Sequence, residues 1–439
     1  MSSASLSEKH DHPGGVVRGM KRLSVILATL AVAACQPQPA NNRSGQTDFA
    51  AKPHSAGSDP LAIFSMLESE AAPGDNIVYS PMSTTQAIGI VQLGARGETA
   101  TQIEAVLGIR EGEAGAKRLK GIREALVRDT QGATVRIANT LFLADDYRFE
   151  PAYLDVASRL FGAQADTLDF KSQPDQAVAI INGWADKATE GLVPQVVTSA
   201  NLNREAAAYL ANATFFEGGW QQTFRGGRDA PFLFGDGSEC DFHLMEGKFS
   251  VPFAEVGGWR AVRLAYGPPK QTNSARFVLD VMMPTRRVAN IPRLGAEAMA
   301  QIAAALSTAA PRNVLVEMPR FEADMRRNLI EPLRALGLSL PFDQARADLS
   351  GMSAPGSKRL YIEEAFQVAK LQVHEQGTTA AAVTVPVPVP VGVPPPFEGI
   401  QFTVDRPFVF AIRDLETDTV LFVGRIASPH QYSEPGQPE

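Results

Sequence analysis

Apolar residues recur with two different spacings between residues 59 and 430, and together they predict alternating helices and strands. Helical spacing covers residues 61–67, and Ser80 and Pro81 suit the N-cap and the first position of a further helix. Strand-like runs lie at residues 76–80, 135–143, 208–216 and 277–284. No internal repeat and no second domain boundary interrupts the pattern. We therefore predict one domain of the α+β class over residues 59–430, followed by a C-terminal tail at 431–439.

Composition and charge limit the classes of function. The chain has 439 residues, of which 44% are hydrophobic, and this is enough for a substantial core. Its net charge is −7 and its pI is about 5.6. These values argue against a nucleic-acid partner, because the sequence offers no basic stripe to attract phosphates.

The N-terminal residues have the organisation of a secretion signal. Within residues 20–35, two basic residues precede an apolar run of about a dozen residues, which is too short to span a bilayer stably. Small residues then lead to Cys35. This site resembles a bacterial lipobox, in which Cys35 would become the lipid-modified first residue of the mature protein. An ordinary signal peptide with a chance cysteine is the alternative.

The segments around this signal complete the prediction of localisation. We interpret Met20 as the true start and residues 1–35 as the signal segment. Residues 36–58 are rich in Pro, Asn, Ser, Gly and Gln and read as a flexible tether. Gln36 after the cysteine resembles the pattern of outer-membrane lipoproteins. We expect a secreted protein anchored by lipid at a bacterial outer membrane, on its periplasmic or its outer face.

The sequence lacks the motifs of a conventional active site. It contains no G-x-S-x-G elbow, no phosphate-binding glycine loop, no C-x-x-C pair and no H-E-x-x-H array. The histidines of the domain are His243 and His374, and we interpret His374 as a solvated strand residue. Cys240 lies in a strand-like run and is predicted to be a buried structural cysteine. We expect a protein that is not an enzyme and that has no metal and no cofactor.

One stretch of unusual composition lies near the C-terminus. Glu375 to Gly392 reads EQGTTAAAVTVPVPVPVG. Its first half has small residues after Gly377, which is free to adopt positive φ, and its second half alternates valine with φ-restricting proline. A linker is one interpretation, but only residues 393–439 follow, too few for an ordinary further domain. The alternative is a surface loop that can move at its start and stands extended at its end.

Runs of residues in the right order resemble the serpin family. FTVDRPFVFAI at 402–412 and LFVGRIASP at 421–429 resemble its C-terminal signature and closing strand. The motif N-A-x-x-F-x-G-x-W-x-x-x-F begins at Asn212, and A-N-x-L-F begins at Ala138. The resemblance covers about residues 59–430. It implies a serpin fold with three β-sheets, about eight or nine helices and an exposed reactive-centre loop.

The resemblance also implies roles for particular residues. It assigns the hinge of an inhibitory loop to Glu375, Gly377, Thr378, Thr379, Ala380, Ala381, Ala382 and Thr384. It places Ser80, Ser83, Asn212 and Gln367 at the shutter, below the central sheet where its strands part, with Gln367 where a histidine is usual. Trp184 is expected under the breach, where the loop enters the sheet.

The implied activity is suicide inhibition of a serine protease by a monomer. The protease cleaves the loop as a covalent acyl-enzyme and is trapped when the loop inserts into the central sheet. Counting about fourteen residues from Gly377, as the family does, gives a reactive bond between Val391 and Gly392. The neighbouring valine bonds precede proline and are poor substrates. A small branched Val391 suits an elastase-like pocket.

The prolines keep a second interpretation open. Pro386, Pro388 and Pro390 share one parity, so each would remove an N–H from the same side of an inserted strand. The alternative function is a non-inhibitory, serpin-fold surface binding protein that proteases cleave as a plain substrate.

Overall fold

The computed structural model describes residues 61–128, 132–268, 275–357, 359–378 and 397–429. The chain divides into two compact units, residues 1–45 and 46–439, and every described residue belongs to the second. Cys35 and the tether therefore lie outside the described residues. No helix in the described ranges combines the length and apolar character that crossing a membrane requires.

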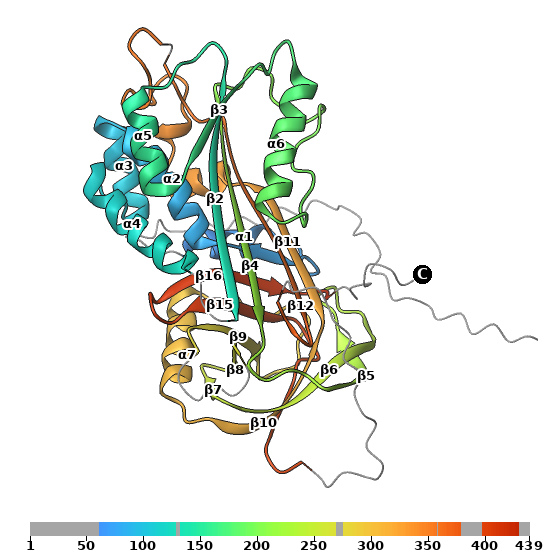
Figure 1. The fold of residues 1–439 in the computed structure, drawn as a ribbon. Helices are drawn as coiled ribbons and strands as arrows, with labels where there is room; N and C mark the ends of the chain where they lie inside the picture. Colours follow the sequence, from blue (N-terminus) through green and yellow to red (C-terminus); the bar gives the residue numbers. More distant parts are fainter. Residues whose placement is uncertain (1–60, 129–131, 269–274, 358, 379–396, 430–439) are drawn as a thin grey trace, which may run out of the picture. The chain divides into compact units, whose positions relative to one another are not determined.

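Helices and strands alternate along the described chain much as the sequence pattern predicts (Figure 1). The helices are α1 (Ala62–Glu70), α2 (Pro81–Gly94), α3 (Gly97–Leu107), α4 (Gly112–Val127), α5 (Pro151–Phe161), α6 (Pro174–Ala188), α7 (Ala296–Thr308) and α8 (Ile330–Ala335). The strand expected at 76–80 is β1 (Ile77–Tyr79).

The strands form three sheets, as expected. The main sheet has the order β11 (Phe321–Asn328), β12 (Glu364–His374), β13 (Gly377–Thr378), β4 (Ala208–Gly219), β2 (Ala133–Ala144), β3 (Gln164–Leu168). The second sheet has the order β1, β16 (Thr419–Ile426), β15 (Phe408–Asp414), β9 (Phe277–Pro284), β8 (Trp259–Ala265), β7 (Phe253–Val256). The third has the order β14 (Ile400–Thr403), β10 (Arg312–Pro319), β6 (Glu239–Val251), β5 (Gly226–Leu233).

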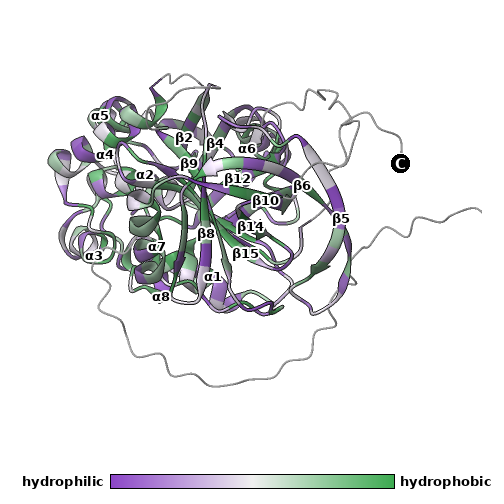
Figure 2. Cartoon of the chain, turned by 90° about the horizontal axis from the view of Figure 1, so that it is seen from below, coloured by the Kyte–Doolittle hydropathy of each residue, from purple (hydrophilic) through white to green (hydrophobic). Residues whose placement is uncertain are grey.

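The core lies where the main and second sheets face each other across α2. Helix α2 contacts both β4 and β16 and is buried on nearly every side. Its buried residues are apolar except for Ser83, Thr84, Gln86 and Gln92. Ser80 begins this helix, because its side chain accepts a hydrogen bond from the Ser83 amide at 3.3 Å, and Pro81 occupies the first turn. Figure 2 shows hydrophobic positions along the inner strands and hydrophilic ones on the outer turns of the helices. Helix α6 covers the outer face of the main sheet (Figure 1).

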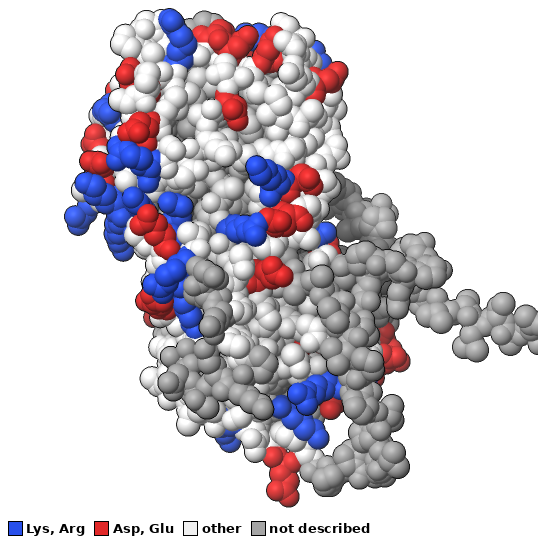
Figure 3. Space-filling model, in the orientation of Figure 1, with Lys and Arg blue, Asp and Glu red and all other residues white. Residues whose placement is uncertain are grey.

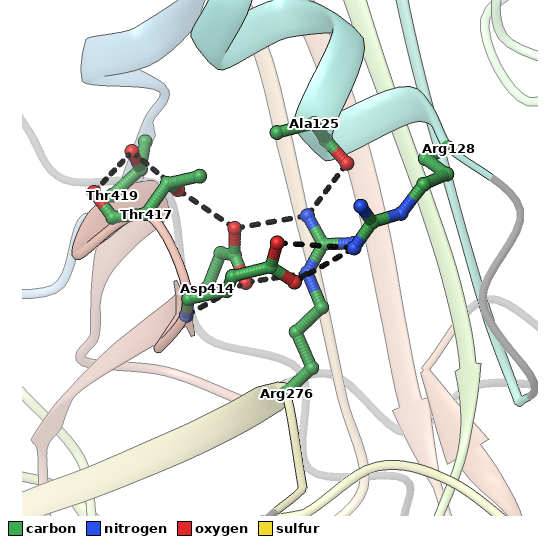
Figure 4. A network of polar contacts seen from close by, with 7 residues as sticks. Ala125, Arg128, Arg276, Asp414, Thr417 and Thr419 are labelled. Atoms are coloured by element: carbon green, nitrogen blue, oxygen red, sulfur yellow. Dashed lines mark hydrogen bonds and ion pairs between the residues drawn. The ribbon is translucent and has the colours of Figure 1, made fainter.

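A charged network closes the fold between α4 and the second sheet (Figure 4). Arg276 donates to both carboxylate oxygens of Asp414, at 2.8 and 3.1 Å, and to the Ala125 carbonyl at the end of α4, at 2.6 Å. Burial alone would raise the pKa of Asp414, but hydrogen bonds from Arg276 and Thr417 lower it below its usual range. Arg128 adds an exposed ion pair to Glu416 at 2.8 Å.

Charges of both signs are interspersed over the face drawn in Figure 3, with basic side chains gathered over α4. Within α4, Lys117 forms an ion pair with Glu113, and Lys120 forms one with Glu124. Cys240 is half-buried beside the phenylalanines of β5 and β6.

Candidate functional site

The hinge predicted from sequence enters the main sheet as a two-residue strand. In β13, Gly377 faces His374 on one side and Gly219 on the other, and Thr378 faces Val373 and Gly218. The strand is antiparallel to both β12 and β4. Thr378 is fully buried there. The structure therefore holds the first residues of the predicted loop between two strands of the sheet.

Gly377 is needed for space. A Cβ at this position would overlap the carbonyl oxygen of Gly218 on β4. The chain can approach β4 this closely only without a side chain. Gly377 does not adopt positive φ, so here the glycine is required for space and not for a left-handed backbone conformation.

Two aromatic residues hold the hinge in place. The Tyr266 and Thr378 hydroxyls are hydrogen-bonded at 2.6 Å, and both side chains are buried. Trp220 stacks on Tyr266 with ring centroids 4.4 Å apart. Its indole N–H donates to the His374 carbonyl at 2.8 Å, and its backbone N–H donates to the Gln376 carbonyl at 2.8 Å. The turn before β13 is thus fixed from one side by Trp220.

Glu375, at the start of the turn, is fixed from the other side. Its carboxylate accepts from the Nε–H of Arg320 at 2.8 Å, and its backbone carbonyl accepts from the Phe224 amide at 3.1 Å. His374 beside it is only 5% exposed, and its Nδ1 accepts from the Gln376 amide at 3.2 Å. The expectation of a solvated His374 was wrong, because the turn folds back over the strand end.

Beyond the hinge, β4 and β12 pair directly with each other. Six residues of β12, Glu364 to Ala369, face Tyr209 to Thr214 of β4 in a parallel register. A strand that extended β13 would have to separate these six pairs. Parallel pairing is slightly less stable per residue than antiparallel pairing, so this seam is the weaker type of contact in the sheet.

The structure brings together the predicted shutter residues beneath this seam. The buried Gln367 side chain accepts from the Ser80 amide at 2.9 Å and donates to the Ser80 carbonyl at 2.9 Å and to the Thr84 hydroxyl at 3.2 Å. The Ser83 hydroxyl donates to the Asn212 carboxamide oxygen. Asn212 and Gln367 are themselves direct neighbours in the β4–β12 register. We call Ser80, Ser83, Asn212 and Gln367 the shutter cluster.

Asn212 extends the shutter cluster along the sheet. It donates to Asn139 on β2 at 2.6 Å, and Ser83 also bonds the Thr214 hydroxyl. Helix α2 is therefore linked by polar side chains to β2, β4 and β12. All of these bonds lie in the buried interior, where they are worth most when complete.

Trp184 does not lie where the sequence resemblance placed it. It sits on α6 and meets Phe142 of β2 edge to face at 6.1 Å, and Phe142 pairs with Tyr209 near the start of β4. The hinge enters at Gly218, nine residues further along β4, which is about 30 Å at the rise of a strand. The tryptophan at the hinge is Trp220, which the motif beginning at Asn212 already contained.

The remaining predicted loop residues lie beyond the part of the chain that the structure describes. Those outside the described residues are Thr379, Ala380, Ala381, Ala382, Thr384, Val391 and Gly392, together with Cys35. The described ranges contain no group of three His, Cys, Asp or Glu side chains arranged to hold a metal ion. His243 is exposed and bonds Asp229 at 2.9 Å.

Comparison with known proteins identifies the family. The sequence profile of the family described as "Serpin (serine protease inhibitor)" matches residues 60–429. The chain belongs to the serpin family. It is 30% identical to the leukocyte elastase inhibitor A of Mus musculus and to serpin B11 of Homo sapiens. Each alignment covers 84% of this chain and 97% of the relative.

Solved structures show the same serpin fold. The structure of native protease nexin-1 with heparin matches with a TM-score of 0.72 and 25% identity, and it covers 85% of this chain and 98% of that one. Uncleaved ovalbumin matches with a TM-score of 0.72 at 24% identity, covering 86% of this chain and all of that one. The expected three-sheet fold is thus confirmed.

Proposed function

We propose that this serpin is a suicide inhibitor of an elastase-like serine protease and supplies no catalytic group of its own. The observation that carries the proposal is β13, a hinge strand that already lies antiparallel between two parallel strands. After cleavage at the proposed Val391–Gly392 bond, continued insertion would replace one parallel ladder by two antiparallel ones. That exchange adds hydrogen bonds and supplies the driving force.

The register of β13 defines how far the loop would insert. Thr378 faces Gly218, so each later loop residue would face one residue earlier in β4. Six residues after Thr378, Thr384 would lie opposite Asn212 of β4. It would also lie opposite Gln367 of β12, which is six residues before Val373, the partner of Thr378. Insertion would separate two members of the shutter cluster and place a threonine hydroxyl between them.

The same count reduces the cost of the prolines. Pro386 would face Leu210, Pro388 would face Ala208, the first residue of β4, and Pro390 would lie beyond the strand. At most two missing N–H groups then fall inside the sheet. At a net value of about 1 kcal/mol per bond, they forfeit about 1–2 kcal/mol. The gain from two new ladders exceeds this loss.

The choice of an elastase-like target rests on the loop and on one relative. Val391 is a small branched residue, suited to a shallow apolar pocket rather than to an acidic one. The murine relative at 30% identity is named a leukocyte elastase inhibitor. The partner of this chain is then an elastase-like serine protease, held as a covalent acyl-enzyme by one copy of the serpin.

The test is to mix the soluble domain with an elastase and follow the products on denaturing gels and by mass spectrometry. A covalent complex and a new terminus at Gly392 support the proposal. Complete cleavage that leaves the protease active would instead favour the non-inhibitory binding protein, in which the prolines stop insertion.

Thr378→Arg tests insertion itself. Because Thr378 is fully buried between two strands, an arginine there would bring an unpaired charge into the sheet, at a cost of several kcal/mol. We expect the covalent complex to fall at least tenfold and cleaved serpin to accumulate. Gln376→Arg is the matched control, since Gln376 lies half-buried in the turn outside the sheet. Equal inhibition by both variants would refute the insertion mechanism.

We further propose that Cys35 carries the lipid anchor and places the protein at a bacterial outer membrane. The support is the lipobox-like run before Cys35 and the polar tether after it. Metabolic labelling with a tagged fatty acid should mark the full chain and not its Cys35→Ser variant. Equal labelling of the two chains, or none of either, would refute it.

A further inference from the structure

A small polar cavity lies at the C-terminal end of α1, and none of its lining residues belongs to the hinge or to the shutter cluster. Its volume is about 250 Å³. It is bounded by α1, by the loop from α1 to β1, by β16 and by the loop before α7. Glu68 and Arg425 form its buried floor, with exposed fractions of 3% and 5%, and Ser69, Asn290 and Arg293 are exposed around its mouth.

Glu68 lines this cavity without a bonding partner. Both of its carboxylate oxygens are buried, and within the described part of the chain neither accepts a hydrogen bond. Burial raises its pKa to about 7, although Arg425 and Arg293 act in the opposite direction. The two arginines are thus near enough to lower the pKa of Glu68 electrostatically, but they form no ion pair with it. A buried carboxylate normally has partners, so this one is suited to receive donors from a ligand.

Arg425 offers the complementary half of the site. One of its terminal nitrogens donates to the carbonyls of Ala72 and Asp75, at 2.8 and 3.3 Å, so the loop after α1 fixes its position. Its buried Nε–H has no acceptor among the described residues. Arg293 adds a second guanidinium at the mouth. The cavity therefore holds an unused acceptor and an unused charged donor side by side.

We propose that this cavity binds a small zwitterionic α-amino acid, with its ammonium group on Glu68 and its carboxylate on Arg425 and Arg293. A lone cation would leave the Arg425 Nε–H without an acceptor, and a lone anion would face the Glu68 carboxylate. The volume has room for about eight water molecules at roughly 30 Å³ each, so an amino acid with a short side chain fits.

The test is calorimetric titration of the folded chain with glycine and alanine at about pH 8, where Glu68 is mostly ionised. Acetate and methylammonium serve as half-ligands, and trimethylglycine controls for general solute effects because its nitrogen has no N–H. We expect saturable binding of glycine, and affinities at least tenfold weaker for acetate and methylammonium. If acetate or methylammonium bound saturably with the same affinity as glycine, the site would not recognise a zwitterion and the proposal would be wrong.

Three variants locate the site. Glu68→Gln keeps the shape and removes the charge, and Arg293→Gln changes an exposed side chain, so neither needs the fold to readjust. Each should weaken glycine binding at least tenfold. Glu70→Gln is the matched control, because Glu70 lies on the same helix and forms an exposed ion pair with Arg327 at 3.7 Å. It should leave binding unchanged. If neither glycine nor alanine bound saturably, water alone would fill the cavity. If glycine bound Glu68→Gln with unchanged affinity, its binding site would lie elsewhere, and either result would refute the proposal.

Discussion

The hydrogen bond between Tyr266 and Thr378 should control how firmly the hinge is docked. The Tyr266→Phe substitution removes one hydroxyl and keeps the ring that stacks on Trp220. The Thr378 hydroxyl, fully buried, is then left without this partner. An unsatisfied buried hydroxyl costs about 1–3 kcal/mol. Undocking of β13 should become easier by about 5- to 150-fold, since 1.4 kcal/mol is a factor of ten.

Hydrogen exchange of the intact, uncleaved protein measures this directly. Peptides that cover Gly377 and Thr378 should exchange faster in the Tyr266→Phe variant by that factor, because the amides of β13 exchange only when the hinge opens. Peptides from β9, which is buried along its whole length, should be unchanged and provide the internal control.

A double substitution separates the loss of the hydrogen bond itself from the cost of leaving the buried Thr378 hydroxyl without a partner. Thr378→Val removes the other hydroxyl at almost constant shape, so the Tyr266→Phe, Thr378→Val pair leaves no unsatisfied donor or acceptor between them. When both partners become apolar, the net effect is close to neutral. The pair should therefore recover most of the protection lost in the single Tyr266→Phe variant. Hinge exchange that stays at the parental rate in the single variant, or that is as fast in the pair as in the single, would refute the reasoning.

Three further substitutions test the buried polar groups, each by the denaturant midpoint for loss of the native form. Arg276→Met strands the Asp414 carboxylate and should cost about 3–5 kcal/mol, whereas the exposed Arg128→Met should cost under about 1 kcal/mol; equal losses would contradict the network. Glu68→Gln should match the parent near pH 4.5 and exceed its stability by about 3 kcal/mol above pH 7, because only the parent must ionise a buried carboxyl; a pH-independent difference would exclude this. Relative to the parent, Gln367→His should lose stability below about pH 6.5, since a protonated imidazole cannot accept from Ser80; a stability difference between variant and parent that does not change with pH would contradict it.

The fold class was predictable because it depends on order and spacing, whereas the shutter was implied only by the family resemblance. Alternating apolar positions indicate strands, and the Ser80–Pro81 pair indicates a helix start. The contact between Gln367 and Ser80 joins residues 287 positions apart, so no local pattern contains it. Only the resemblance to known serpins could place those two side chains together.

The contacts of the hinge could not be predicted from the sequence, for three physical reasons. Gly377 and Thr378 could either pair with β12 and β4 or remain exposed to solvent, and their composition is compatible with both. His374 is buried by a turn that follows it, which alternation along the strand cannot reveal. Nothing in the composition around Trp184 and Trp220 shows which of them lies at the hinge, and only their contacts in the fold do.

The seam between β4 and β12 is where the proposed insertion would open the main sheet. Toward α2 it presents Asn212 beside Gln367. The alanines of the seam pair with larger residues, Ala211 with Phe366, Ala213 with Val368 and Ala365 with Leu210. Large interlocking side chains would have to leave their packing sites before the strands could part, and the loss of those contacts would oppose insertion. An alanine on one side of a pair limits that loss, but Phe366 also meets Tyr209 across the seam with ring centroids 6.4 Å apart, and opening must break this contact. The specificity of the closed seam comes instead from polar bonds between the shutter cluster and α2. A strand carrying Thr384 to that level would bring a hydroxyl group that can replace part of what opening breaks. In the proposed mechanism, these polar bonds would hold the sheet closed before cleavage, and the arriving hydroxyl would offset part of the cost of opening it afterwards.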